Sequence, residues 1–282
     1  MLCRIGNIEV WRILESVDPF LMPEDFFVDT DLDPVAELAR LAPRQLCPET
    51  GRMLLPIQGF LLKTPDHVIL VDACVGNHKT FPLFDTWHQR SGGRFMAGLA
   101  AAGVSPEDVD YVLCTHLHVD HVGWNTKLED GRWVPTFANA RYILPAEDNA
   151  HFCADPSPVY QESVSPVIAA GQAELVAADH QLGDHVALIS TPGHTPGHVS
   201  VQIRDGDMAA IITGDALHST VQCWHPHWNF AHDADRPLAA QSRRTLLEIS
   251  SGSGDVILGS HFPLPSLGRI RADGDNFRWI ED

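Results

Sequence analysis

Short apolar runs separated by turn residues dominate the chain of 282 residues, and this pattern predicts many strands. Residues 8–16 alternate between apolar and polar positions around Arg12. Residues 54–62 and 67–72 are typical of two paired strands that turn at 64–66. Further strands are expected where similar runs recur, at residues 111–114, 131–136, 140–144, 175–178, 186–190, 199–204, 208–213 and 256–261, and in a hairpin over 268–279.

Helices are predicted where apolar positions recur at helical spacing next to residues that begin or end helices. Residues 34–41 fit best, because Asp33 is a good N-cap and Pro34 suits the first helical position. Residues 95–102 form a second such segment, which Gly103 ends. Further helical segments are expected at residues 105–108, from 145 onward, at 155–171 and at 237–250.

Two stretches lack a regular pattern. Residues 18–34 combine prolines with aromatic residues, and they either cap the core or form a wall of an active site. Residues 218–235 hold four histidines and three aromatic residues, and a place near the active site is expected for them. No repeat or low-complexity linker divides the chain. Strands precede helices in two successive blocks, which predicts a single domain over residues 1–282 with two sheet halves.

The densest chemistry lies in residues 115–123, with the sequence Thr-His-Leu-His-Val-Asp-His-Val-Gly. Alternate residues of an extended chain point the same way, so His116 and His118 are placed to hold one metal ion. The chain must then turn, and Asp120 and His121 approach from another direction that suits a second ion. A solvated histidine-rich loop is the alternative interpretation, and the residues further along the chain weigh against it.

Three further polar residues stand at the ends of apolar runs. His194 follows a strand and a Thr-Pro-Gly turn, Asp215 follows a strand and a glycine, and His261 ends the last buried strand. Ligands on strand ends are held rigidly, which a metal site requires. Asp72 also ends a buried strand, where it is either a turn-former or a carboxylate that orients metal ligands from behind.

Composition narrows the expected function. The chain is 44% hydrophobic, enough for a large core, and carries a formal net charge of −18. The lack of a basic cluster disfavours nucleic acid, so a small neutral substrate is expected. No apolar run is long enough for a membrane span and no signal peptide is recognisable, so a cytoplasmic protein is expected, either a monomer or a homodimer. The six scattered cysteines favour reduced, mostly structural thiols.

The motifs together resemble one known family. An H-x-H-x-D-H motif, a T-P-G-H-T-P-G-H segment, a G-D pair and a strand-terminal histidine are similar to those of the metallo-β-lactamase fold hydrolases, from Asp72 to His261. The resemblance implies an α/β (α+β) fold, the αββα sandwich of that family, with two divalent metal ions at one edge. Zinc is the default for histidine and aspartate ligands, and manganese, iron or cobalt would also suit them.

The resemblance implies a role for each residue of these motifs. The implied metal ligands are His116, His118 and His194 for the first ion, Asp120, His121 and His261 for the second, and Asp215 as the bridge between them. Asp72 matches the acid that the family carries at the end of an early strand. His198 is expected to be structural, since the family's ligand is the first histidine of the repeated segment.

Details of the motifs point to one branch of the family. A bridging Asp215 is a feature of the lactonase, glyoxalase II and phosphotriesterase-like branches. The chain length and the V-G-W-N segment look most like the N-acyl homoserine lactonase and methyl parathion hydrolase relatives. Quorum-quenching lactonases commonly have a tyrosine three residues after the bridging aspartate, whereas this chain has His218. That departure leaves the substrate open.

The resulting hypothesis is a hydrolase that attacks a carboxylic ester or lactone with a hydroxide bridging two metal ions. Asp120 would pass the proton onward, and His218 would donate a hydrogen bond to a substrate oxygen unless it merely faces water. Phosphotriester or thioester hydrolysis is the alternative, and a non-catalytic metal-binding sensor is a third interpretation. The expected substrate-pocket residues are Trp124, Trp224, Trp228 and Phe230.

Overall fold

The computed structural model describes residues 1–281 and divides the chain into two compact units. Unit 1 comprises Met1–Ser16 and Ile57–His180, and unit 2 comprises Val17–Pro56 and Gln181–Asp282. The chain therefore passes between the units three times. A single domain over 1–282 stays a prediction, whereas the expected division into two sheet-containing halves matches the two seven-stranded sheets.

The sheet of unit 1 has the strand order β1-β2-β4-β5-β6-β9-β10. Its strands β5, β6, β9 and β10 run parallel, with β10 at the edge of the sheet. The inner strands β5, β6 and β9 are buried apolar runs, because parallel strands are usually covered on both faces. The bounds of these strands are β1 Cys3–Ile5, β2 Ile8–Pro19, β4 Leu54–Lys63, β5 Val68–Val71, β6 Tyr111–Leu113, β9 Arg141–Pro145 and β10 Ala173–Val176.

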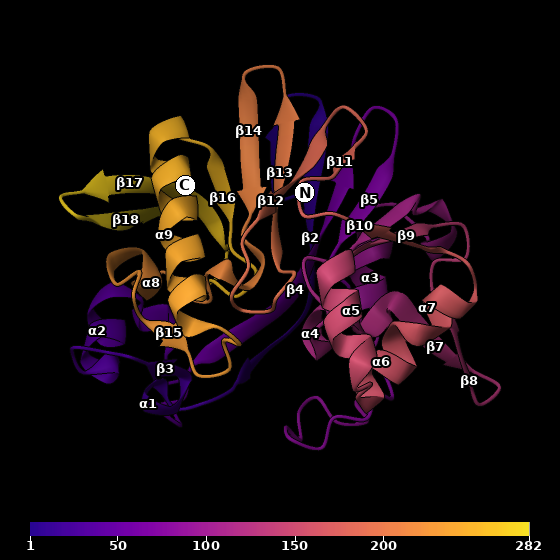
Figure 1. The fold of residues 1–282 in the computed structure, drawn as a ribbon, viewed down its shortest axis with the longest axis horizontal. Coiled ribbons are helices and arrows are strands. Elements are labelled where there is room, and N and C mark those ends of the chain that lie inside the picture. The colour runs from indigo at the N-terminus through magenta and orange to yellow at the C-terminus, as the bar shows by residue number, and fades with distance from the viewer. Residues whose placement is uncertain (282) are drawn as a thin grey trace. The chain divides into compact units, whose positions relative to one another are not determined.

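Helices and a small hairpin complete unit 1. Figure 1 shows α3, α5, α6 and α7 gathered beside β9 and β10. The helices are α3 Arg94–Ala101, α4 Val119–Val122, α5 Ala146–Ala154, α6 Pro158–Ser163 and α7 Ser165–Ala169, with 3₁₀ turns η2 Pro106–Asp108 and η3 Gly123–Asn125. The hairpin is made of β7 Thr126–Glu129 and β8 Arg132–Pro135.

The sheet of unit 2 has the order β11-β12-β13-β14-β16-β17-β18. All neighbours pair antiparallel except β14 and β16, whose parallel pairing requires a crossover, and the long helix α9 supplies it. The strands are β11 Gln181–Leu182, β12 Val186–Ser190, β13 Val199–Asp205, β14 Met208–Ile212, β16 Val256–Leu258, β17 Leu267–Asp273 and β18 Asn276–Glu281. Helix α9 packs against β17 over a core that includes Leu246, Leu247 and Ile270.

The remaining elements of unit 2 come from the two stretches without a regular pattern. A two-stranded ribbon joins them, with Phe27 opposite Phe230 and Val28 opposite Asn229. The elements are α1 Pro23–Phe26, β3 Phe27–Val28, α2 Pro34–Leu41, η1 Pro43–Gln45, η4 Gly214–Ala216, α8 Val221–Trp224, β15 Asn229–Phe230 and α9 Arg236–Ser253. The ribbon could not be predicted from the sequence pattern, because each of its strands has only two residues, which is too short for an alternation of apolar and polar positions to show.

The aromatic residues of segment 18–34 belong to the core of unit 2. Phe20, Phe26 and Phe27 are all buried, and Phe26 packs against Phe230 with ring centroids 4.5 Å apart. Of the two interpretations of this segment, capping of the core is therefore the one that the structure supports.

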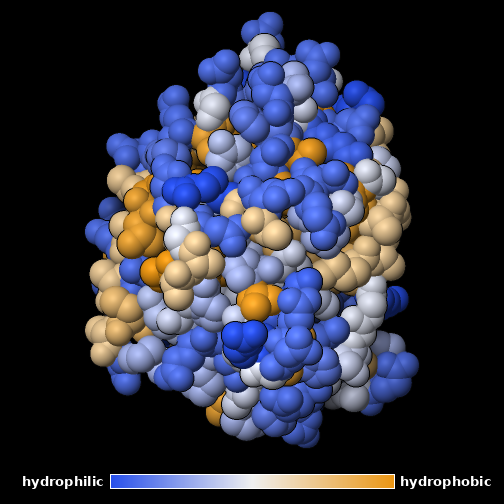
Figure 2. Space-filling view, turned by 90° about the vertical axis from the view of Figure 1, so that its right-hand side faces the viewer, coloured by the Kyte–Doolittle hydropathy of each residue, from blue (hydrophilic) through white to orange (hydrophobic). Residues whose placement is uncertain are grey.

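The surface and the thiols agree with the composition. Figure 2 shows a predominantly hydrophilic face on which apolar side chains form small, scattered groups. All six cysteines are free thiols, as expected from their spacing. Among residues 1–281, no helix combines the length and the apolar composition that crossing a membrane requires.

Candidate metal centre

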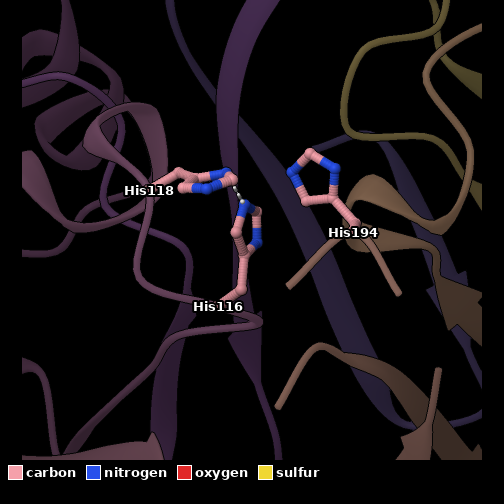
Figure 3. A group of neighbouring side chains, drawn as sticks. All are labelled: His116, His118 and His194. Carbon is pink, nitrogen blue, oxygen red and sulfur yellow. Dashed lines mark hydrogen bonds between the residues drawn. The ribbon is translucent and has the colours of Figure 1, made fainter. Parts of the chain in front are cut away.

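In unit 1, the residues of the H-x-H-x-D-H motif follow the buried strand β6. The ring nitrogens Nε2 of His116 and Nδ1 of His118 lie 3.1 Å apart, so the two imidazoles point toward one another (Figure 3). His116 is fully buried, and its other ring nitrogen lies 3.1 Å from the hydroxyl of Thr115. Two imidazole nitrogens at this separation can share a metal ion, as alternate residues of an extended segment were predicted to do.

Asp72 contacts two residues of the motif, which fits the second of its two interpretations, a carboxylate that orients metal ligands. Its Oδ2 is 2.9 Å from Nδ1 of His121, and its Oδ1 accepts a hydrogen bond from the backbone N–H of Thr115 at 2.8 Å. An ionised carboxylate only accepts, so Nδ1 of His121 carries the proton and Nε2 keeps its lone pair. Asp72 therefore fixes the tautomer of His121 that a metal requires.

A short helical turn, α4, carries Asp120 and His121. The carbonyl of His121 accepts from Ala73 N–H, and Gly123 donates to the carbonyl of Cys74, both at 2.7 Å. A Cβ at Gly123 would lie 1.8 Å from the carbonyl oxygen of Val75, so only glycine allows this close approach. The glycine that ends the motif thus sets where the turn lies against the strand β5.

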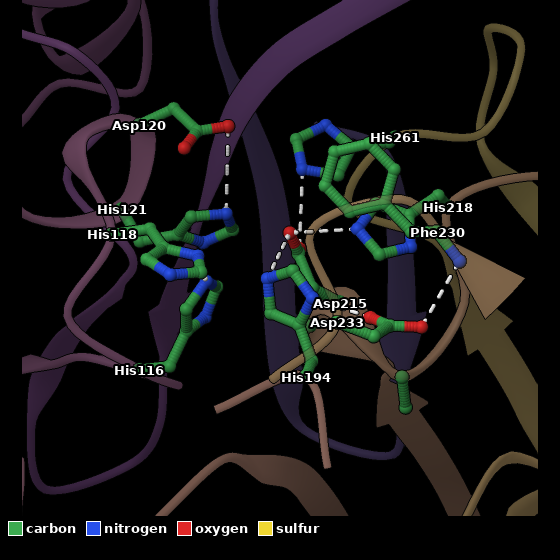
Figure 4. A network of polar contacts seen from close by, with 12 residues as sticks. His116, His118, Asp120, His121, His194, Asp215, His218, Phe230, Asp233 and His261 are labelled. Carbon is green, nitrogen blue, oxygen red and sulfur yellow. Dashed lines mark hydrogen bonds and ion pairs between the residues drawn. The ribbon is translucent and has the colours of Figure 1, made fainter. Parts of the chain in front are cut away.

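In unit 2, Asp215 faces three histidines (Figure 4). Its Oδ2 lies 3.3 Å from Nε2 of His194 and 3.2 Å from Nε2 of His218, and its Oδ1 lies 3.1 Å from Nε2 of His261. All four side chains are buried. The carboxylate therefore presents each of its oxygens to at least one imidazole, which is the arrangement that a bridging carboxylate needs.

Asp233 orients His194, and sequence analysis missed it. Its Oδ1 lies 2.8 Å from Nδ1 of His194, which leaves Nε2 of that ring facing Asp215. Its Oδ2 accepts from the N–H of Phe230 and from the buried Arg243. Burial alone would raise the pKa of Asp233, but the hydrogen bond with His194 and the charges nearby lower it to about 2. The carboxylate is ionised and can hold the proton of His194 in place.

Arg243 ties this carboxylate to the irregular loop. The guanidinium is fully buried and donates to the backbone carbonyls of Ala216, Pro226 and Trp228. No motif marks Asp233 or Arg243, because one stands in a loop and the other on a helix. The only signal in the sequence was an arginine at an inward-facing position of a predicted helix, which calls for an acidic partner.

Two further hydrogen bonds orient the other two candidate ligands of unit 2, His261 and Asp215. Nδ1 of His261 lies 2.8 Å from the carbonyl oxygen of Pro56, so its Nε2 is the atom free of a proton. His198 accepts from the backbone N–H of Asp215 at 2.8 Å through Nε2. His198 is thus a structural residue that positions the backbone of Asp215, as expected.

His218 is enclosed and does not face water. Its side chain is 2% exposed, and it packs against the rings of Phe26, Phe230 and His261. Burial lowers the pKa of His218 to about 4, so the ring is neutral at pH 7 and carries one N–H. The interpretation of a solvent-facing loop histidine is therefore wrong.

Only one of the four residues expected to line the substrate pocket lies beside the histidines. Phe230 stacks on His194 with centroids 5.9 Å apart and lies 4.6 Å from the ring of His218. Trp228 is fully buried between Phe27 and His225, so it offers no surface to a substrate.

The other two tryptophans are held elsewhere in the fold. Trp124 stacks on Phe95 and donates from Nε1 to the buried carboxylate of Glu15 at 2.7 Å, within the core of unit 1. Trp224 contacts the guanidinium groups of Arg40 and Arg278, which lie 5.7 and 5.9 Å from the centre of its ring. Both were assigned to the pocket because they neighbour the motifs in sequence. The side chains of neighbouring residues on a turn can point in different directions.

The donor sets of both units fit divalent metal ions. Ligand atoms around a zinc ion with bonds of about 2.0–2.1 Å lie about 3.3 Å apart, and the contacts of Asp215 with His194 and His261, at 3.3 and 3.1 Å, are close to this separation. The rings of His121, His194 and His261 each donate a hydrogen bond from Nδ1–H to an oxygen atom that is not one of the candidate ligand atoms. That pattern leaves Nε2 of these three rings available, as metal-ligating histidines require.

Comparison with known proteins identifies the family. Residues 53–261 match the family model of the metallo-beta-lactamase superfamily, and the chain therefore belongs to that superfamily. The N-acyl homoserine lactonase of Bacillus sp is 24% identical over 237 residues, which cover 75% of this chain and 83% of the lactonase. The corresponding lactonase of Bacillus cereus is 26% identical over 223 residues, with the same coverage.

Solved structures support the same fold. A hydrolase of the beta-lactamase superfamily, AbOPH, superposes with a TM-score of 0.82 at 23% identity, covering 99% of this chain and 96% of its own. AidC, a dizinc quorum-quenching lactonase solved with N-hexanoyl-L-homoserine, gives 0.80 at 22% identity, with the same coverage. The fold class predicted from the motifs is confirmed, as is the resemblance to the lactonase branch, and the protein is a hydrolase of this superfamily.

Proposed function

We propose that this protein is a dinuclear metal-dependent hydrolase that cleaves a carboxylic ester or a lactone. The observation that carries the proposal is Asp215, which directs both carboxylate oxygens at imidazole nitrogens in a buried setting. The proposed ligands are His116, His118 and His194 for one ion, Asp120, His121 and His261 for the other, and Asp215 for both. Two such ions, most simply zinc, would activate water near neutral pH and polarise the substrate carbonyl.

The residues around the ligands would prepare the site before substrate arrives. Asp72 and Asp233 hold the protons of His121 and His194 away from the ligand nitrogens. The ligand histidines thus need no change of tautomer on metal binding, and they remain in one rotamer because they are buried. Asp120 has a carboxylate oxygen 3.6 Å from Nε2 of His121, which would place it to accept a proton during turnover.

His218 is the proposed donor to a substrate oxygen. It is neutral, buried and three residues from Asp215, and its enclosure by Phe26 and Phe230 would strengthen a hydrogen bond to developing negative charge. The N-acyl homoserine lactonases are relatives by sequence, which supports lactones as the first substrates to test.

A phosphotriester is the second candidate, because aromatic rings enclose His218 where lactonases of this branch commonly carry a tyrosine. Thioester hydrolysis of the glyoxalase II kind receives less support. Two of the three arginines of the C-terminal hairpin are engaged, since Arg278 pairs with Asp273 and Arg269 donates to the carbonyl of Gly254.

Zinc-loaded protein assayed against a homoserine lactone, an aryl acetate, a phosphotriester and hydroxyacyl-glutathione would test the proposal. We expect turnover of the lactone or the aryl ester and its loss in Asp215→Asn, whereas Asp207→Asn, in an exposed turn of the same sheet, should match the wild type. Metal binding without turnover of any substrate would favour a non-catalytic sensor. Turnover that survives Asp215→Asn would contradict the proposed site.

A further inference from the structure

A second group of metal-ligand side chains lies in unit 2, outside the candidate metal centre. Asp31, His225 and His227 each offer a ligand atom, and these three atoms lie within 4.8 Å of one another. Asp31 and His227 are 62% and 53% exposed, whereas His225 is buried. A cation can thus reach the group from solvent and still find one rigid ligand inside.

Glu37 prepares His225 for a metal. Its Oε2 lies 2.8 Å from Nε2 of His225, and the same carboxylate is hydrogen-bonded to Arg40. The carboxylate that pairs with Arg40 accepts the hydrogen bond of His225, so Nε2 carries the proton. The lone pair of neutral His225 is then on Nδ1. Stacking on Trp228, with centroids 4.4 Å apart and planes at 11°, fixes the ring.

Asp31 and His227 already meet as ligands of one ion would. Nε2 of His227 lies 3.0 Å from Oδ1 of Asp31, and Nε1 of Trp228 donates to the same oxygen at 2.9 Å. A metal ion would replace the proton between the imidazole and the carboxylate. The indole would remain as a hydrogen-bond donor that orients the aspartate.

The segments that carry these residues are held together independently of any metal. Asp31 follows β3, and both histidines precede β15, which pairs with β3 in the short ribbon. Asn229 also donates to Asp29 at 3.1 Å across the ribbon. The three ligands are therefore brought together by the fold and are not a chance meeting of mobile side chains.

We propose that Asp31, His225 and His227 bind a zinc ion that is separate from the candidate metal centre. Two imidazoles and one carboxylate are a common zinc ligand set, and water would complete the four-coordinate shell. Such an ion would brace the ribbon at the strand whose Phe230 packs on His194 and His218. Its role would be structural, because its three ligands form a group of their own that shares no residue with the candidate metal centre.

The test is a count of zinc per chain after equilibrium dialysis of the full-length protein against zinc alone. His227→Ala is the first variant, since an exposed side chain can be removed without disturbing the fold. We expect it, and Asp31→Asn, to bind one equivalent fewer than the wild type. His151→Ala removes an exposed histidine of helix α5 and should bind the same number as the wild type.

Equal zinc counts for the wild type, His227→Ala and Asp31→Asn would overturn the inference. So would the loss of an equivalent in His151→Ala, because it would show unspecific binding to surface histidines. The result is independent of the proposed function. Asp215→Asn should lower the count in a protein whose His227 is intact, and His227→Ala should lower it by a further equivalent in that background.

Discussion

Single residues behind the ligands decide whether the histidines are ready for a metal. His194 and His121 each donate a hydrogen bond from Nδ1–H to a carboxylate, and His261 donates one to a backbone carbonyl. Asp72 could be foreseen because it follows the buried strand β5, which pairs with the strand β6 that leads into the motif. Asp233 could not, because it reaches His194 from a loop that follows it by 39 residues. The candidate ligands could be predicted from the sequence. Of the two carboxylates that orient them, only Asp72 could.

Replacing Asp233 tests this division of roles. Asp233→Asn would put an amide N–H against the N–H of either His194 or Arg243, so the tautomer of His194 would no longer be fixed. We expect zinc affinity to fall about 10- to 100-fold, as for other carboxylates behind metal-bound histidines. Competition with a chromophoric chelator measures the affinity. Unchanged affinity in a folded variant would remove Asp233 from the account, and Asp207→Asn is the matched control.

Replacing His218 separates donation to the substrate from metal binding. His218→Phe keeps a ring between Phe26 and Phe230 but removes the N–H. We expect kcat to fall about 10²- to 10³-fold with KM little changed, as when a donor to an oxyanion is lost, while the zinc count stays the same. Steady-state kinetics with parallel zinc analysis decide the matter. A lost equivalent of zinc would instead identify His218 as a ligand.

At the scale of elements, periodic segments were predicted well and short or aperiodic ones were not. Helix α2 with its Asp33 cap and the β13–β14 hairpin lie where the pattern placed them, because a cap and a two-residue turn act locally. The strands β3 and β15 were missed. Their partner is about 200 residues away, and only tertiary pairing makes them strands.

The turn α4 offers a test at this scale. Gly123→Ala would place a methyl group 1.8 Å from the carbonyl oxygen of Val75, so the turn that carries Asp120 and His121 would have to move. We expect a loss of several kcal/mol in unfolding free energy, with zinc binding weakened. Gly92→Ala is the control, because nothing lies near the added methyl group there. Denaturant unfolding compares the two, and equal midpoints would refute the close contact.

The buried Lys79 gives the fold a pH dependence. Its ammonium group lies over the ring of Trp133, 3.5 Å from the centroid, and donates to Thr126. Burial lowers the pKa of Lys79 from 10.5 to about 7. Between these values the unfolded chain binds more protons than the native one, so this lysine makes stability rise with pH, by at most about 1.4 kcal/mol per pH unit.

Lys79→Met removes that contribution. Relative to the wild type, the variant should therefore be most stable below pH 7 and should lose its advantage as the pH rises toward 10. Urea unfolding of both proteins at pH 6.5 and pH 9.5 measures the difference. A stability difference that is the same at both values would show that Lys79 keeps its charge in the native state.

At the scale of the whole molecule, the two units carry unlike sets of candidate ligands. Unit 1 carries a compact motif within nine residues, and unit 2 carries candidate ligands in the segments that follow three separate strands. The ligand motif of unit 1 could be recognised as a metal site by itself. The candidate ligands of unit 2 could be recognised only from the resemblance to the family. The net charge of −18 agrees with a centre that takes up cations and a neutral substrate.

The central claim is that two metal ions together make this site a hydrolase. Its most direct test is a zinc titration of metal-free protein while hydrolysis of the best substrate in the panel is followed. The His227→Ala background removes the separate surface site from the count. We expect activity that reaches its maximum at two equivalents of zinc and does not return in Asp215→Asn. Full activity without metal, or at a single equivalent, would contradict it.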